Sequence, residues 1–473
     1  MRSAWALLSC LLVLLSPASL AAQASAQHVL VATQQKVAPV TQLLDVDLAR
    51  GKLRLLGRFK HDGLAPLAMA MDPIRRDLIL AQRLGSLSRL LRIGFNGTRI
   101  LSEQVLADVQ GEVRSLVLAD LGDIFVSVAG RNGGIHRIPR NGGTAKLVSR
   151  TPRASGMTAN LNYGHSALIV QSGSVSPVAD PGGSLVDLRS GKVVRSLQFK
   201  GLKPLGLTGV IETPTALVQH FISNEAGRIL QSTFFSTPKE LALTPKLPAG
   251  ATRRIRSPRF FSVLVLGGAA HPHLKTFTPF GLNRAWKMLA GPLPGDPVDF
   301  DFIPISRAAV LRFGPSCSLA AKGLTFSWSG TPVLGSQRFF LNAYGAQPSQ
   351  QVLLLLGTSS QQFGKLPLPI RLPGTCELLT SVEIILVQSS KRRGQVFARL
   401  PVPNQPALSG RSLFAQFLEP RAGSLLTSEG GALHLGAEEA MEIGAAAARD
   451  PNDRIRAKAV AKAATARSPA AYQ

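Results

Sequence analysis

The sequence predicts an all-β protein, and three observations lead to this fold class. From His28 to about Gly314, short apolar and β-branched runs alternate with turns rich in Gly, Asn, Asp and Pro. These runs recur about every 45 residues, a length typical of a four-stranded propeller blade. After Gly314, several strands alternate apolar and polar residues, as two packed sheets require. We therefore expect a β-propeller, then an antiparallel β-sandwich, then an Ala-rich, partly helical tail.

The propeller prediction rests on a repeated order of strands and turns. A first, incomplete unit covers residues 28–59, and the stretch 298–311 would complete it. Such closure joins the two ends of the ring and removes exposed sheet edges. We expect six blades, with seven as the alternative because the fifth and sixth units are blurred. The complete units begin near Leu67, Val113, Gly156, Leu205 and Arg254.

Residues 1–26 have the pattern of a signal peptide. Arg2 precedes an apolar core, and Ala24-Ser25-Ala26 forms a small-residue cleavage signal before Gln27. Cys10 lies inside the apolar core rather than at its end, which disfavours a lipid anchor. No later stretch reaches the ~18 apolar residues of a membrane span. We expect an exported, extracytoplasmic protein with a propeller at 27–314, a sandwich at 315–437 and a flexible or helical tail at 438–473.

Two cysteines remain after the leader, Cys317 and Cys376. In an oxidising compartment such a pair is most simply a disulfide. A metal site is the competing interpretation, but residues 318–375 contain no His. We therefore predict a disulfide within the sandwich.

The chain is strongly basic, with 53 Lys and Arg against 27 Asp and Glu and a formal charge of +26. This charge favours polyanions such as acidic polysaccharide or a cell-envelope polymer. The alternative is a solubilising surface in a high-pI proteome, because the positive residues are spread along the chain. Aromatic residues make up only 6%, which argues against the stacking platforms of single-stranded nucleic-acid binders.

Few residues are candidates for chemistry. Glu112 and Asp299 lie near blade-opening strands and are the best candidates for a metal in a propeller channel, although such acids more often cap turns or pair with a surface Arg. His271 and His273 are the only closely spaced histidines, but Pro272 between them indicates a turn. Two imidazoles without a third ligand make a weak metal site. We predict no catalytic residue, metal or cofactor.

Residues 317–436 contain a series of short motifs, in the order Cys317, Gly330–Gly335, Leu353–Gly357, Leu366–Pro369, Pro373–Leu378, Val402–Asn404, Leu408–Gly410 and Phe414–Gln416. In the order and spacing of these motifs, the region resembles a module found at the C-termini of secreted proteins of planctomycete-type bacteria. The resemblance implies an extracytoplasmic, non-catalytic sandwich that either attaches the protein to the surface or stabilises it. The N-terminal region resembles secreted NHL-type, lactonase-like and streptogramin-lyase-like propellers in architecture only.

The function class that these observations favour is non-enzymatic binding or scaffolding at the cell surface or outside the cell. The alternative is a propeller hydrolase or lyase, lactonase-like, acting on an extracellular substrate. Three or more acids or histidines lining the channel would favour the enzyme, and an apolar or Arg-lined channel would favour binding. The ligand does not follow from the sequence, because propeller sites assemble from loops far apart in the chain.

Overall fold

The computed structural model describes residues 28–437 with gaps, and its regular elements are β-strands apart from one 3-10 turn, η1 (Pro406–Leu408). The expected signal peptide and tail, and His271, lie outside the described residues. The gaps fall at residues 35–39, 49, 61–65, 73, 96–99, 119–122, 130–132, 151–153, 161–166, 173–181, 189, 199–203, 213–217, 225–228, 234–238, 241–253, 260–261, 268–271, 278–286, 304–307, 318–322, 338 and 374–375.

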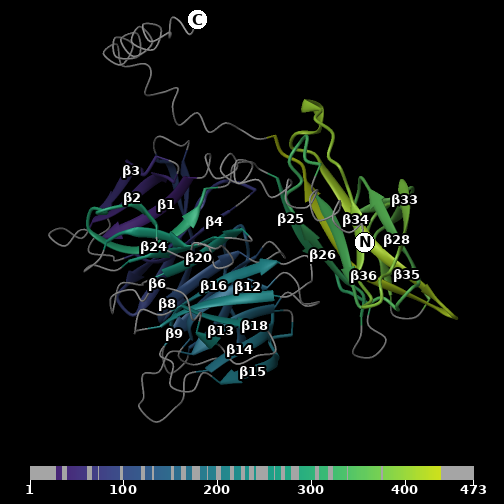
Figure 1. Cartoon of the computed structure of the whole chain (residues 1–473), viewed down its shortest axis with the longest axis horizontal. Coiled ribbons are helices and arrows are strands. Elements are labelled where there is room, and N and C mark those ends of the chain that lie inside the picture. Colours follow the sequence, from purple (N-terminus) through teal and green to yellow (C-terminus); the bar gives the residue numbers. More distant parts are fainter. Residues whose placement is uncertain are drawn as a thin grey trace, which may run out of the picture.

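The first part of the chain forms six four-stranded antiparallel sheets, drawn purple to green in Figure 1. Sheet 1 has the order β24-β1-β2-β3, and the other five each use four consecutive strands. Sheet 1 contains β1 (His28–Gln34), β2 (Val40–Asp47), β3 (Lys52–Lys60) and β24 (Asp296–Phe302). Sheet 2 contains β4 (Pro66–Met71), β5 (Leu78–Leu84), β6 (Leu87–Phe95) and β7 (Ile100–Gln110). Sheet 3 contains β8 (Glu112–Leu118), β9 (Ile124–Ala129), β10 (Gly134–Ile138) and β11 (Lys146–Ser149).

The other three sheets of this part follow the same plan. Sheet 4 contains β12 (Ala154–Asn160), β13 (Ala167–Ser172), β14 (Gly182–Asp187) and β15 (Val193–Gln198). Sheet 5 contains β16 (Pro204–Glu212), β17 (Val218–Asn224), β18 (Ile229–Thr233) and β19 (Lys239–Glu240). Sheet 6 contains β20 (Arg254–Arg259), β21 (Ser262–Leu266), β22 (Leu274–Phe277) and β23 (Lys287–Ala290). The starts of these units agree with the repeat that the sequence predicts.

The first strands of these sheets follow one another in space. β4 lies against β8, β8 against β12, β12 against β16 and β16 against β20. β20 then lies against β24, which in turn lies against β4. Apolar clusters fill the space between neighbouring sheets: one joins sheets 1 and 2, one joins sheets 2 and 3, one joins sheets 3 and 4, and one joins sheets 6 and 1.

Sheet 1 is completed by a strand from far along the chain. β24 pairs antiparallel with β1, so that Val31 lies opposite Phe300. The sequence predicted this completion from the stretch 298–311, but the completing strand ends at Phe302. The following strand, β25 (Ala309–Phe313), pairs instead with β36 (Ser424–His434). The part of the prediction that extended to residue 311 was therefore wrong, because Val310 packs into the later sheets rather than into sheet 1.

The second part of the chain contains a five-stranded and a three-stranded antiparallel sheet, drawn green to yellow in Figure 1. The five-stranded sheet has the order β25-β36-β35-β28-β33 and includes β28 (Gln351–Gly357), β33 (Ile384–Ser389) and β35 (Ser412–Arg421). The three-stranded sheet contains β26 (Thr325–Ser329), β27 (Phe340–Tyr344) and β34 (Val396–Arg399). Two short pairs complete this part, β29 (Gln362–Phe363) with β30 (Leu366–Pro367) and β31 (Ile370–Arg371) with β32 (Glu377–Leu378).

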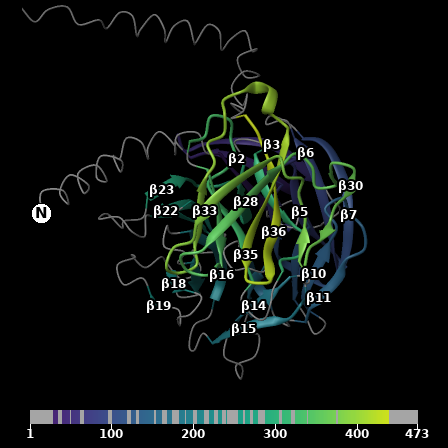
Figure 2. The same ribbon diagram turned by 90° about the vertical axis from the view of Figure 1, so that its right-hand side faces the viewer.

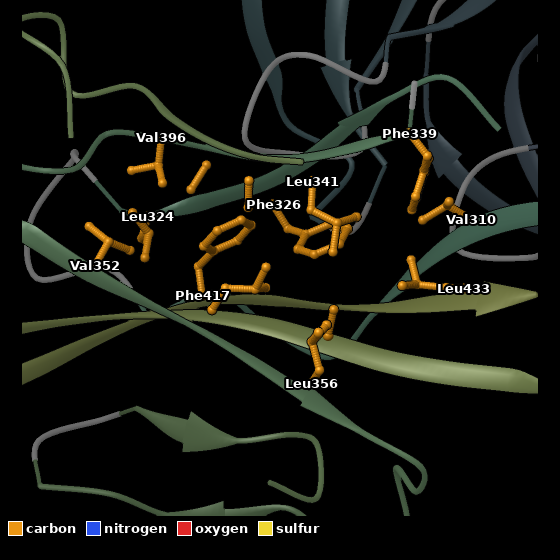
Figure 3. Close-up of a cluster of buried hydrophobic side chains, with 14 of the residues drawn as sticks. Val310, Leu324, Phe326, Phe339, Leu341, Val352, Leu356, Val396, Phe417 and Leu433 are labelled. Carbon is orange, nitrogen blue, oxygen red and sulfur yellow. The ribbon is translucent and has the colours of Figure 1, made fainter. Parts of the chain in front are cut away.

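One apolar cluster joins these two larger sheets. Phe326 and Leu341 reach it from the three-stranded sheet, and Val352, Phe417 and Leu433 reach it from the five-stranded sheet (Figure 3). All five side chains are fully buried. Removing apolar surface from water is worth about 25 cal/mol per Å², so this cluster holds the two sheets together.

A disulfide joins Cys317 to Cys376, with Cα atoms 4.8 Å apart. Both cysteines are buried and pack against Leu426 of β36. The prediction of a disulfide within this part of the chain is therefore confirmed.

Candidate functional site

The site begins at the turn between β4 and β5. Asp72 is fully buried, and its Oδ1 accepts hydrogen bonds from the backbone N–H groups of Ile74 and Arg75 at 3.0 and 3.1 Å. The backbone closes the turn as well, because Asp72 N–H donates to the Asp77 carbonyl at 2.8 Å. An Asp at the start of a turn forms such bonds readily because its short side chain reaches the backbone two residues on.

A second turn, between β10 and β11, reaches Asp72 from sheet 3. The Arg140 guanidinium donates from Nε to Asp72 Oδ2 at 2.9 Å and from Nη2 to Oδ1. Such forked Arg–carboxylate pairs combine charge attraction with a fixed geometry. Gly142 gives this turn its shape, with φ of +94° and its N–H bonded to the Pro139 carbonyl. The ion pair therefore ties the turns of two neighbouring sheets together.

Arg92 of β6 lies beside this ion pair and is almost completely buried, with 5% of its surface exposed. Its Nη2 donates to the Arg140 carbonyl oxygen. Its Nε lies 3.9 Å from Asp77 Oδ2, which is ion-pair distance but too long for a hydrogen bond. Among the residues that the structure describes, neither Nε nor Nη1 of Arg92 has a hydrogen-bond partner.

The charges around Arg92 do not balance. Burial lowers the pKa of the Arg92 guanidinium, and the nearby positive charge of Arg75 lowers it further. Asp72 and Asp77 oppose the shift, and Arg140 adds to it. We call these five residues the Arg92 cluster. It contains three guanidinium groups and two carboxylates, and Asp72 is already held by Arg140.

One member of the cluster, Arg140, acts on a residue of the second part of the chain. Burial lowers the pKa of His434, at the end of β36, and the positive charge of Arg140 lowers it further. His434 Nδ1 lies 2.8 Å from the hydroxyl oxygen of Ser412 in β35. The Arg140 side chain therefore lies within electrostatic range of His434 at the end of β36.

Asp299 is not a member of this cluster and links two sheets. It lies on β24 and is 1% exposed. Its Oδ2 accepts the backbone N–H of Met69 in β4 at 2.9 Å, and its Oδ1 accepts that of Phe300. Asp301 repeats the arrangement two residues on, accepting the N–H of Met71 at 2.8 Å. These carboxylates join the first strands of two neighbouring sheets.

Glu112 has the surface pairing that the sequence analysis named as its alternative role. Its Oε2 lies 2.6 Å from Arg83 Nη2 and 3.1 Å from Arg114 Nη2. Both arginines are about half exposed. Glu112 and Asp299 therefore serve different contacts and do not form a shared site.

His273 is partly buried just before β22, where its backbone carbonyl accepts the N–H of Gly267 at 2.9 Å. A Cβ added at Gly291 would lie 2.0 Å from its Nδ1, so the ring packs directly on that glycine. Among the described residues, no group of three or more His, Cys, Asp and Glu is placed to hold a metal. Within the same part of the chain, no helix has the length and apolarity that crossing a membrane requires.

Sequence reasoning did not find the Arg92 cluster. Arg140 stands alone in a turn, and Arg92 lies in an apolar strand where alternation suggests an outward-facing charge. The available signals were the Asp-Pro pair at residues 72–73 and the Asn-Gly-Gly turn at 141–143, which mark turns of the repeat. No family model matches the chain, and no curated protein matches its sequence.

Proposed function

We propose that the chain is an exported protein that binds or scaffolds at the cell surface or outside the cell without catalysis. In this proposal the six four-stranded sheets are the blades of a β-propeller, closed by β24 and β1. The two later sheets form a β-sandwich of the module that residues 317–436 resemble. The order in which the first strands contact one another supports the propeller. The cluster shared by the two later sheets supports the sandwich.

The observation that carries the choice of ligand is the guanidinium of Arg92, which is buried with two nitrogens lacking hydrogen-bond partners among the described residues. A buried N–H group without a partner costs about 1–3 kcal/mol, and a charged group costs more. An oxyanion such as carboxylate, sulfate or phosphate would accept a charge-assisted hydrogen bond from one of these nitrogens. We therefore propose that the ligand presents an oxyanion to the Arg92 cluster.

Anionic polysaccharide and cell-envelope polymer are the ligands that fit this chemistry and the charge of +26. The net charge raises the concentration of a polyanion near the protein but selects no particular partner. The Arg92 cluster adds hydrogen-bond donors in fixed positions, and such fixed positions distinguish one anionic group from another. Arg75 is the exposed member of the cluster, and its Nη2 donates to Asn141 Oδ1 at 2.7 Å. Arg75 is thus the side chain through which a bulky polymer would first meet the site.

Binding of the full mature chain to a panel of acidic polysaccharides and wall polymers, at low and physiological salt, tests this proposal. We expect selective binding that survives physiological salt and falls at least ~10-fold in Arg92→Met, a loss of about 1.4 kcal/mol. Because Arg92→Met also removes the hydrogen bond to the Arg140 carbonyl, circular dichroism and the urea midpoint of the variant are measured alongside its binding.

Arg89→Met is the matched control, because it removes the same charge from the same strand. Arg89 forms an exposed fork with Asp108, at 2.9 and 3.0 Å, and we expect its removal to leave polymer affinity nearly unchanged. Equal losses in both variants, or uniform binding that disappears with salt, would mean that the net charge alone attracts the polymers.

Export is tested by fractionating cells that express the whole chain or a version without residues 1–26. We expect the whole chain outside the cytoplasm, with the bond between Cys317 and Cys376 oxidised. Recovery of the whole chain in the cytoplasm with both thiols reduced would contradict the extracytoplasmic location, because that compartment keeps thiols reduced.

A further inference from the structure

β33 forms one end of the five-stranded sheet and exposes an unusual amount of apolar surface. Figure 2 shows it at the left of the sheet that faces the viewer, beside β28. Ile384, Ile385 and Val387 are 52%, 53% and 55% exposed. Three large apolar side chains within four residues are therefore open to solvent on the last strand of a sheet.

The exposed residues occupy both faces of β33. Ile385 lies opposite Leu355 of β28, and the next residue, Leu386, lies opposite Leu354. Leu386 packs against the cluster between the two sheets. Because neighbouring residues of a strand point to opposite faces, Ile385 and Val387 share the outer face, and Ile384 lies on the inner face with Leu386. The three-stranded sheet does not cover Ile384.

β33 also lacks the charges that protect the other sheet ends. Natural proteins guard exposed edge strands with charged side chains, especially Lys, which oppose pairing with another chain. Among the described strands that end a four- or five-stranded sheet and expose large apolar residues, β33 alone contains no charged residue. The guarding charges elsewhere include Lys52, Arg54 and Arg58 in β3, Glu103 and Asp108 in β7, Lys146 in β11, and Lys287 in β23.

We propose that the occupant of this edge is a second copy of the chain, paired antiparallel along β33 across a two-fold axis. The charges at the two ends of the strand favour this partner. Glu383 lies exposed just before β33, and Lys391, Arg392 and Arg393 lie exposed just after it. Antiparallel pairing of two copies brings the acid of each copy toward the basic turn of the other, whereas parallel pairing would bring like charges together. A two-fold axis produces both contacts at once.

The apolar residues indicate the register. Pairing centred on Leu386 sets Ile385 of each copy opposite Val387 of the other, on the outer face of a joined ten-stranded sheet. Cross-strand pairs of this kind stabilise a sheet by about 0.2–1 kcal/mol each. This register forms two such pairs and covers four side chains that are exposed in a single copy.

Sedimentation velocity of the full mature chain over a range of concentrations tests the dimer. We expect a monomer–dimer equilibrium that Ile385→Lys and Val387→Lys each shift to monomer. Both sites are more than half exposed, so these variants should keep their fold, which circular dichroism checks. Met288→Lys in β23 and Leu101→Lys in β7 are matched controls, because they remove exposed apolar residues of similar size (54% and 57% exposed). We expect both controls to dimerise like the parent chain.

Cross-linking tests the register independently. Mixing Ile385→Cys with Val387→Cys should give a disulfide between the two variants faster than either variant forms with itself. A parent chain that stays monomeric at the highest soluble concentration would overturn the proposal, as would controls that lose the dimer equally. Faster self-linking of either variant would overturn the register. A monomer whose β33 instead binds a strand-forming peptide would assign the edge to a different protein and would also refute the second copy.

Discussion

Replacing Asp299 with Asn tests whether this residue holds two sheets together or serves a ligand. The carboxylate accepts the Met69 N–H with one oxygen and the Phe300 N–H with the other. Asn keeps the shape of the side chain but has a single acceptor oxygen, and its other terminal atom is a donor. One backbone N–H must therefore lose its acceptor and face an NH₂ group.

The expected cost follows from burial. Asp299 is 1% exposed, so water cannot replace the lost acceptor. An unsatisfied buried donor costs about 1–3 kcal/mol, and we expect Asp299→Asn to lower the free energy of unfolding by about 2 kcal/mol. Glu112→Gln is the control for removing a carboxylate, because Glu112 pairs with half-exposed arginines. A surface ion pair is worth about 0–1 kcal/mol, so the control should change stability much less.

Urea unfolding followed by far-UV circular dichroism measures both variants, and polymer binding is measured on the same samples. We expect Asp299→Asn to unfold at a lower urea concentration while its affinity for polymer at low temperature is unchanged. The opposite pattern, unchanged unfolding with lost binding, would show that the Asp299 carboxylate serves the ligand and would refute the structural assignment.

Three further predictions concern two histidines and the disulfide. The hydrogen bond to Asp45 raises the pKa of His28, so its stabilising effect is full below about pH 6.5 and is lost as pH rises through the folded pKa. His28→Gln should therefore lower the thermal midpoint mainly under mildly acidic conditions. Burial lowers the pKa of His434, so the folded state loses stability as pH falls below about 6.5. His434→Gln should reduce this sensitivity to acid. If the parent chain and the two histidine variants showed the same dependence of the thermal midpoint on pH, both expectations would be contradicted. Replacing Cys317 and Cys376 with Ser should lower the unfolding free energy by about 4 kcal/mol on the chain-entropy model, and an unchanged urea midpoint would contradict it.

The strands of the repeat could be predicted because their signals are local. Residues 67–71 and 78–82 are apolar runs separated by an Asp-Pro turn, and they form β4 and β5 in the structure. Each of these strand and turn patterns spans about ten residues, and over that length the alternation of apolar residues and the turn residues determine the backbone conformation. The disulfide followed from counting, since two cysteines lie outside the predicted leader.

The strand β36 was not predicted, because its sequence reads as a loop. It contains Glu429, Gly430 and Gly431, residue types that are depleted in strands. A Cβ at Gly431 would lie 2.2 Å from the Phe326 ring, so the glycine makes room for that core side chain. Glu429 is fully buried, and its Oε2 accepts the Phe326 N–H at 3.1 Å. Packing against a distant strand here outweighs local propensity.

The sequence by itself determined the all-β class, the starts of the repeated units and the cysteine pair, because periodicity, turn residues and composition act over short distances. Tertiary structure decided which side chains meet. Asp72, Arg92 and Arg140 come from two sheets, and only the packing of those sheets buries the Arg92 guanidinium beside the ion pair. The exposure of Ile385 on an unguarded sheet end likewise depends on strand order, which places β33 last. Contacts between segments far apart in the chain leave no local pattern, and for that reason the site and the dimer edge emerge only from the fold.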